Sequence, residues 1–210
     1  MAELKITPTR MEQKKLKLRL EMSRRGHRLL SNKRDELMRQ FIETVREAKK
    51  LREVLSSEAE ILDNSFIAAA AVSDPKIMIE SLMLPSAMGE LKVKRKSIMS
   101  VEVPVFSYDI KALSSIPYGF AFTSGELDEA ISYVASVATR LIKLAELESC
   151  AMLLCEEIEK TRRRVNALEH IMIPQYENAL RRIAMKLDEN ERASATRLMK
   201  VKDMIIKASR

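Results

Sequence analysis

Side chains that could carry out chemistry are few in this sequence and stand far apart. Its two histidines, His27 and His170, have no set of cysteines or carboxylates around them at the spacing of metal ligands. Cys150 and Cys155 lie five residues apart on one expected helix, a spacing that fits neither a zinc site, a redox motif nor a disulfide. No phosphate-binding glycine loop or nucleophile elbow is present. We therefore expect no catalytic site, no metal and no cofactor.

The densest charged cluster is the run Arg162–Arg164. Three consecutive residues of a helix spread around its circumference, so they cannot all face the same neighbouring helix. At least one of these arginines must face solvent or another chain. Carboxylate pairs such as Glu156–Glu157 and Asp188–Glu189 fall on charged helical faces, where solvated ion pairs are their ordinary role. These clusters indicate exposed helix surfaces rather than a reaction site.

The elements that carry these residues are two long helices, and the first is expected over residues 8–72. Thr7-Pro8 is a helix-start signal, with a hydroxyl cap before a proline at the first helical position. Steps of three and four residues from Leu16 follow an apolar stripe with charged residues on both sides, which is the repeat of a coiled-coil seam. We expect the seam to contain Leu16, Leu20, Leu30, Leu37, Phe41, Leu51 and Leu55.

The second helix is expected over residues 124–208, with a capping box that begins at Thr123 and ends at Glu126. Its seam is expected to contain Ile131, Val134, Leu141, Leu154, Ile158, Val165 and Leu168. The steps from Leu141 to Leu144 to Leu147 break the regular alternation and should disturb the supercoil locally. Pro174 should kink or interrupt the helix near residues 170–174, because proline lacks an N–H group and its ring clashes with the preceding turn.

Between the two helices, the sequence pattern changes over residues 73–123. Residues 76–89 could hold a short helix that ends at Pro85 and Gly89. Alternating apolar and polar residues then predict a small β-hairpin that turns near Arg95 to Ser97. Residues 107–123 are expected to form a loop. An isolated two-stranded hairpin is marginal in water, so this one must pack on the helices or on a partner.

Composition agrees with long exposed helices. Charged residues make up 32% of the 210 residues and aromatic residues only 4%, with four glycines and six prolines. A helix over residues 8–72 would be roughly 98 Å long, whereas a compact globule of this size has a radius of gyration of roughly 17 Å. We predict a mainly α protein with three parts: a coiled-coil helix (7–72), a central segment (73–123) and a coiled-coil helix (124–208) folded back as an antiparallel hairpin.

Charge is distributed unevenly along the chain. Residues 1–52 carry sixteen basic and seven acidic residues, residues 53–160 carry nine and seventeen, and residues 161–210 carry twelve and six. An antiparallel hairpin would bring both basic termini to one end. That end could attract nucleic acid or lie within an acidic protein cavity. No apolar stretch of membrane-spanning or signal-peptide length is present, so we expect a protein of the cytosol or of the cytosolic face of a membrane.

Several motifs are more specific than a coiled-coil repeat. They begin with Thr7-Pro8-Thr9-Arg10 and a segment that runs from Arg25 to Leu37, and they continue with Ser97–Val101, Val103-Pro104 and Glu126–Ala130. The longest is Glu156–Glu169, which contains Arg-Arg-Arg-Val-Asn-Ala-Leu-Glu, and Ile173-Pro174 follows it. On these motifs the sequence resembles the D-subunit family of V-type and A-type (V/A) ATPases and ATP synthases, over essentially the whole chain.

The resemblance implies a non-catalytic rotor shaft that couples ATP hydrolysis or synthesis to proton or sodium transport. The implied partners are the catalytic and non-catalytic nucleotide-binding ring subunits, a small F subunit and a funnel-shaped subunit on the membrane ring. Arg10 and Arg162–Arg164 are then expected among the ring and torque contacts, with no nucleic acid bound. The alternative that we keep open is a cytosolic coiled-coil adaptor with a basic end that binds nucleic acid. Neither the transported ion, the direction of the motor nor the role of the hairpin at 90–106 follows from the sequence.

Overall fold

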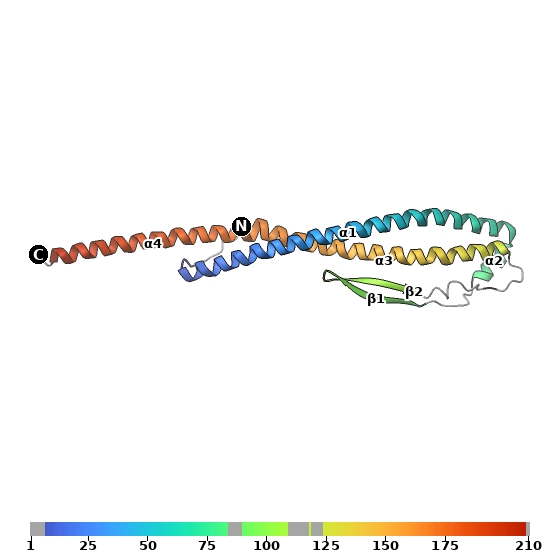
Figure 1. Ribbon diagram of the computed structural model, residues 1–210, viewed down its shortest axis with the longest axis horizontal. Coiled ribbons are helices and arrows are strands. Elements are labelled where there is room, and N and C mark those ends of the chain that lie inside the picture. Colours follow the sequence, from blue (N-terminus) through green and yellow to red (C-terminus); the bar gives the residue numbers. More distant parts are fainter. Residues whose placement is uncertain (1–6, 84–89, 109–117, 119–123, 209–210) are drawn as a thin grey trace. The chain divides into compact units, whose positions relative to one another are not determined.

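The computed structural model describes residues 7–83, 90–108, 118 and 124–208. Its elements are α1 (Arg10–Val72), α2 (Pro75–Leu82), β1 (Leu91–Ile98), β2 (Val101–Tyr108), α3 (Gly125–Ala167), the π-helical turn η2 (Leu168–Met172) and α4 (Ile173–Ala208). The predicted fold class is confirmed. A long helical hairpin is formed by α1 with the joined α3 and α4, and a short helix and a β-hairpin lie between them in the sequence (Figure 1).

The first helix begins later than the sequence pattern indicated. It starts at Arg10, and the Thr9 hydroxyl accepts a hydrogen bond of 3.2 Å from the Glu12 N–H. The expected start at Thr7-Pro8 is therefore wrong. Thr9 and Glu12 have the spacing of a capping box, and this side-chain cap decides the start over the proline signal. From Arg10 the helix continues for 63 residues, through Gly26.

Ion pairs between the helices give the antiparallel direction of the hairpin. Near the start of α1, Arg10 bonds Glu191 and Arg24 bonds Glu177, both at 2.6 Å. Farther along α1, Arg52 pairs with Glu148 of α3. Residue numbers rise in α1 as they fall in its partner, as an antiparallel arrangement requires. Contacts group the chain into two compact units, one of residues up to Asp35 with those from Glu159 onward, and one of Glu36–Ile158.

The β-hairpin belongs to the second of these units and lies beside α3 (Figure 1). Its two antiparallel strands pair from Leu91 opposite Tyr108 to Ile98 opposite Val101. The turn consists of Met99 and Ser100, with φ of 48° and 70°, so the expected turn near Arg95 to Ser97 is wrong. Two consecutive residues with positive φ define a type I′ turn, which normally selects Asn-Gly. Met-Ser does not carry that signal, so sequence alone could not place the turn.

The short helix α2 is also shorter than expected. Asp74 caps it, because its carboxylate accepts a hydrogen bond from the Lys76 N–H at 3.0 Å, and the helix ends at Leu82 rather than at Pro85 to Gly89. Ser73, after α1, donates a hydrogen bond to Ser124, before α3, at 3.0 Å. The expected capping residue Thr123 and most of the expected loop 107–123 lie outside the described residues, but β2 occupies positions 107 and 108.

Candidate functional site

The interior of the Glu36–Ile158 unit is a small apolar core where three elements meet. Leu37 of α1, Val101 and Val103 of β2, and Leu154 and Ile158 of α3 are buried together with Cys150. Phe41, Ile98 and Leu153 pack against this cluster. The inward face of β2 thus covers the helix pair, and this packing supplies the support that a two-stranded sheet lacks in water.

The residues expected in the seam differ in burial. Leu16, Leu37, Leu55, Leu154, Ile158 and Val165 are buried, whereas Leu20, Leu30, Phe41, Leu51, Ile131, Val134 and Leu168 are half-buried. Leu141 departs from the expectation, because half of its surface is exposed. The two successive three-residue steps that follow Leu141 rotate the apolar stripe around α3, so a regular heptad count assigns Leu141 to the wrong face.

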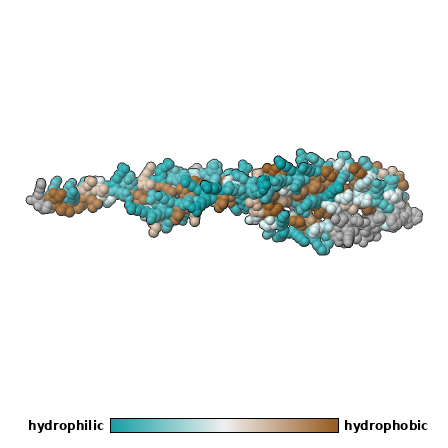
Figure 2. Space-filling model, viewed as in Figure 1, coloured by the Kyte–Doolittle hydropathy of each residue, from teal (hydrophilic) through white to brown (hydrophobic). Residues whose placement is uncertain are grey.

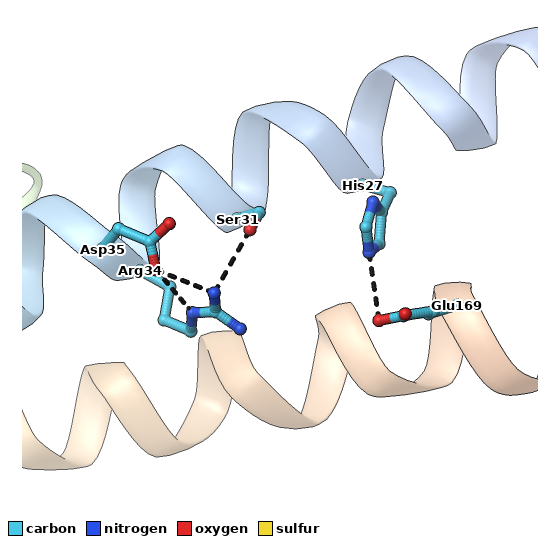
Figure 3. A network of polar contacts seen from close by, with 5 residues as sticks. All are labelled: His27, Ser31, Arg34, Asp35 and Glu169. Atoms are coloured by element: carbon cyan, nitrogen blue, oxygen red, sulfur yellow. Dashed lines mark hydrogen bonds and ion pairs between the residues drawn. The ribbon is translucent and has the colours of Figure 1, made fainter.

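In the unit that contains residues up to Asp35 and from Glu159 onward, polar residues connect α1 with the π-helical turn η2. His27 Nε2 lies 3.3 Å from a carboxylate oxygen of Glu169, which belongs to η2. Two turns farther along α1, the Arg34 guanidinium donates to Ser31 at 3.3 Å and to Asp35 (Figure 3). Sequence reasoning found no acidic partner for His27 because Glu169 is 142 residues away. The contact links two helices, and the described residues offer no third ligand beside it, as a metal site would need.

Regular α-helical bonding is interrupted directly before Pro174. The Ile173 N–H donates to the Leu168 carbonyl, five residues earlier, and this bond closes the π-helical turn. Pro174 has no N–H to donate to His170, and its ring would press on that carbonyl in a regular helix. The wider turn accommodates the proline, and α4 then continues to Ala208.

All four arginines proposed as ring contacts are exposed. Arg10 pairs with Glu191, and Arg163 pairs with Glu159 on its own helix at 3.0 Å. Arg162 and Arg164 flank Arg163 and are exposed as well, while Thr161 and Val165 on either side of the cluster are buried. The cluster therefore lies on the outer surface of α3, where it can meet another chain.

The far end of α4 exposes an apolar surface. Every described residue from Glu191 to Lys207 is exposed, and six of these positions carry large apolar side chains. They are Leu198, Met199, Val201, Met204, Ile205 and Ile206. Figure 2 shows apolar residues gathered at this end of the helix. Large apolar patches on a protein surface are typical of protein–protein contacts. The repeat of Leu198, Val201 and Ile205 is visible in the sequence, but their exposure is a property of the structure.

Two grooves accompany the helix pair in the Glu36–Ile158 unit. One, of about 830 Å³, is lined by α1, by the end of β2 and by α3, with Leu51, Phe106 and Leu147 among its apolar residues. The other, of about 680 Å³, lies along small residues such as Ala48, Ser56 and Ala151. Val45 also lines the second groove, and Met38 and Ile42 precede it at helical spacing on α1; all three are about 40% exposed. Grooves of this kind suit the side chains of a docked partner better than a small polar substrate.

Among the described residues, burial is the main cause of two pKa shifts. Burial raises the pKa of the Cys150 thiol, and the nearby charge of Glu146 adds to the effect. Burial also raises the pKa of Tyr118 far above its ordinary value, and the hydroxyl donates a hydrogen bond of 2.6 Å to Asp128. Both shifts keep a proton on its group. Within the described residues we find neither three potential metal ligands in one place nor a helix apolar and long enough to cross a membrane.

Comparison with known proteins confirms the resemblance read from the motifs. The family model that describes the D subunit of ATP synthase matches residues 12–203. The chain is 52% identical to the V-type ATP synthase D subunit of Clostridioides difficile, over 99% of this chain and 94% of that protein. It is 49% identical to the protein of the same name from Acetivibrio thermocellus, over 98% and 94% of the two chains. A relative from Thermoanaerobacter sp. is 48% identical over 99% of this chain and its own full length. The chain belongs to the ATP synthase D-subunit family.

Proposed function

We propose that this chain is the central-stalk subunit of a V-type rotary ATPase. It is the shaft that couples ATP hydrolysis or synthesis in a surrounding ring to the transport of protons or sodium ions. The observation that carries the proposal is the family match, which covers both arms of the helical hairpin and the β-hairpin. The coiled-coil adaptor that binds nucleic acid is not favoured by this match.

The role of the chain is mechanical rather than catalytic. Nucleotide binding and phosphoryl transfer belong to the ring subunits. The seam residues of α1, α3 and η2 hold the two arms together, so that torque applied to one arm is transmitted to the other. Because the outer faces differ around the hairpin, each angle of the shaft favours a different conformation of the ring sites.

Ring contacts are assigned to two surfaces. The apolar surface of α4 between Leu198 and Ile206 becomes buried against the ring, which removes it from water. Arg10 and Arg162–Arg164 contribute polar contacts that vary with angle. Arginine suits such contacts because its planar guanidinium bonds carboxylates and backbone carbonyls in several directions.

Further partners are assigned to other parts of the chain. The groove along Ala48 and Ala151, with Met38 and Ile42 beside it, is the docking surface for a helix of the small F subunit. The funnel-shaped subunit seats the chain on the membrane ring, at the cytosolic face. The chain itself is peripheral and enters no bilayer.

Reconstitution tests this function. Purified ring subunits are mixed with the full chain, and the stoichiometry is measured by size-exclusion chromatography with light scattering. We expect one copy per ring and a change in ATP turnover. A chain that ignores the ring and leaves turnover unchanged would refute the proposal. The double variant L198D/I205D should bind the ring at least 10-fold more weakly, while the control K200D, on the same exposed helix, should bind within threefold of the original chain.

A further inference from the structure

The two edges of the β-hairpin are not equivalent. On β2, the Phe106 N–H points away from β1 and donates a hydrogen bond of 3.1 Å to Glu146 of α3. One outward donor of this edge is therefore satisfied by the helix. Among the described residues, β1 pairs with β2 alone, and seven of its eight residues are exposed. No other strand of the described residues pairs with the outer edge of β1, which we call the open edge.

The strand register shows which backbone N–H and carbonyl groups of β1 point away from β2. Val93 lies opposite Phe106. Since Phe106 points its N–H outward, the two residues form a non-hydrogen-bonded pair, and Val93 points its own N–H and carbonyl away from β2. This orientation repeats at every second residue, so Leu91, Val93, Arg95 and Ser97 present their backbone groups outward. Four residues of the eight-residue strand thus present the backbone groups that one more strand could pair with.

Charge on this strand is strongly one-sided. Lys92, Lys94 and Lys96 alternate along one face, the face that β1 shares with the buried Val103, which lies opposite Lys96. The opposite face carries Leu91 and Val93, which are 46% and 57% exposed, and Arg95. Two of the basic residues have exposed acidic neighbours, Lys92 with Glu90 at 3.8 Å and Arg95 with Glu102 at 3.1 Å. One face of the edge is therefore basic, and the other combines two exposed apolar side chains with Arg95, which is paired with Glu102.

We propose that β1 is a docking edge for an acidic extended segment of a partner protein, which adds to the hairpin as a third strand. The added strand alternates acidic side chains beside Lys92, Lys94 and Lys96 with apolar side chains beside Leu91 and Val93. Main-chain hydrogen bonds provide affinity in this mode of recognition, and the side chains select the sequence.

The lysines also decide which strand is excluded. Inward-pointing lysines are a common protection of an exposed edge against self-association. A second copy of β1 would place lysines beside lysines, and like charges across strands are destabilising. An acidic strand meets no such repulsion, so the same residues that prevent pairing between copies make the edge selective. This surface is distinct from the ring contacts and does not depend on the stalk function.

A peptide binding experiment on the full chain tests the proposal. The probe is a fluorescently labelled peptide of alternating glutamate and valine, seven residues long, and binding is followed by fluorescence polarisation. The first control has the same sequence with every second amide N-methylated, which keeps its charge and removes its strand hydrogen bonds. We expect the N-methylated peptide to bind at least 10-fold more weakly. Equal binding of both peptides, or no binding of the first at millimolar concentration, would overturn the proposal.

A matched pair of variants locates the binding edge. Val93→Pro removes one outward N–H and leaves the ladder between β1 and β2 intact, since proline is tolerated at an open edge. Val93→Ala trims the side chain and keeps the N–H. We expect V93P to weaken binding of the acidic peptide about 10-fold, and V93A to weaken it less than threefold. Equal losses in both variants would contradict pairing through the backbone.

Charge reversal and hydrogen exchange complete the test. The variant K92E/K94E/K96E should no longer bind the acidic peptide and should instead bind a peptide of alternating lysine and valine. In the original chain, the acidic peptide should slow amide exchange at Val93 and Arg95, which point outward, more than at Lys94, which already bonds β2. If duplex DNA competes with the peptide and binds more tightly at physiological salt, the edge is a nucleic-acid surface and the proposal is wrong.

Discussion

The two cysteines show how the position of a side chain on a helix controls its reactivity. Cys150 is 9% exposed and packs in the core beneath β2, whereas Cys155, farther along α3, is exposed. Burial raises the pKa of Cys150, which reduces its thiolate fraction near neutral pH. The thiolate is the reactive species, so the two residues should differ in rate for two reasons, access and ionisation.

We expect N-ethylmaleimide to modify Cys155 at least 10-fold faster than Cys150 at pH 7.5. Peptide mapping by mass spectrometry after short exposures measures both rates in one sample. Cys155→Ser is the control: its remaining thiol should react slowly in buffer and rapidly in urea, where the core is lost. Comparable rates at the two positions in the folded chain would contradict the burial of Cys150.

The hairpin turn is a second feature at the residue scale. Met99 and Ser100 both have positive φ, which costs a non-glycine residue about 1 kcal/mol or more. The double variant M99N/S100G places the preferred residues of a type I′ turn there. We expect the free energy of unfolding to rise by about 1 kcal/mol, measured by urea denaturation. As a control, Ser97→Gly, within β1, should lower stability. A lower midpoint for M99N/S100G would contradict the assigned turn.

At the scale of elements, the long helices are held by apolar burial and contain local weak points. Gly26 lies in the interior of α1, and glycine there is less favourable than alanine by about 1 kcal/mol. A Cβ atom added at Gly26 would meet nothing within 4 Å. In the same unit, η2 and Pro174 interrupt the regular helix that partners α1. Each long arm of the hairpin therefore contains a residue that is unfavourable inside a regular helix, Gly26 in one arm and Pro174 in the other.

We expect Gly26→Ala to stabilise the chain by up to about 1 kcal/mol, because alanine restricts the unfolded state and creates no clash. Thermal and urea unfolding followed by circular dichroism measure the change. Gly125→Ala is the matched control, since a Cβ there also meets nothing within 4 Å, but its place at the first residue of α3 should make the gain smaller. Destabilisation by G26A would show that glycine is required at this position for another reason.

A substitution in the core of the Glu36–Ile158 unit should change the free energy of unfolding by a larger amount. Leu154 is 1% exposed and packs with Leu37, Val103 and Ile158. Leu154→Ala should lower the free energy of unfolding by about 2–5 kcal/mol, because it removes buried contacts and leaves a cavity. Urea denaturation measures this loss. Met152→Ala, on the exposed face of the same helix, should change stability by less than about 0.5 kcal/mol. Similar losses in both variants would contradict the assigned orientation of α3.

At the scale of the whole molecule, stability and coupling should be separable. The residues that hold the arms together are buried, whereas the proposed torque contacts are exposed. In the Arg162–Arg164 cluster, Arg163 pairs with Glu159 within the helix, and exposed pairs of this kind contribute little to folding. Replacement of the cluster should therefore affect the assembled motor more than the isolated chain.

We expect R162A/R163A/R164A to melt within a few degrees of the original chain and to reduce the number of ions transported per ATP in the reconstituted complex. The decrease should be modest, about twofold, because torque is distributed over many contacts. The charge-conserving triple variant with lysine should retain more coupling than the alanine variant. Full coupling after the alanine replacement would remove this cluster from the proposed contacts.

The elements and the family can be predicted from the amino-acid sequence alone. The heptad stripe from Leu16 onward and the scarcity of glycine and proline are local properties, and they suffice to predict long helices and their antiparallel pairing. The motif around Arg162–Arg164 identified the family that the comparisons confirm. An interruption near Pro174 was also indicated, since the missing N–H belongs to the proline itself.

The local sequence pattern left open several details that become clear only in the folded structure. These are the cap at Thr9, the turn at Met99 and Ser100, the exposure of Leu141 and the π-helical form of the interruption. The open edge of β1 is the clearest case. Its lysines are visible in the sequence, but the difference between the two edges is not, because it depends on Glu146 of α3, which accepts a hydrogen bond from Phe106 on the other edge. Local periodicity cannot report such a contact, because it joins residues 40 positions apart.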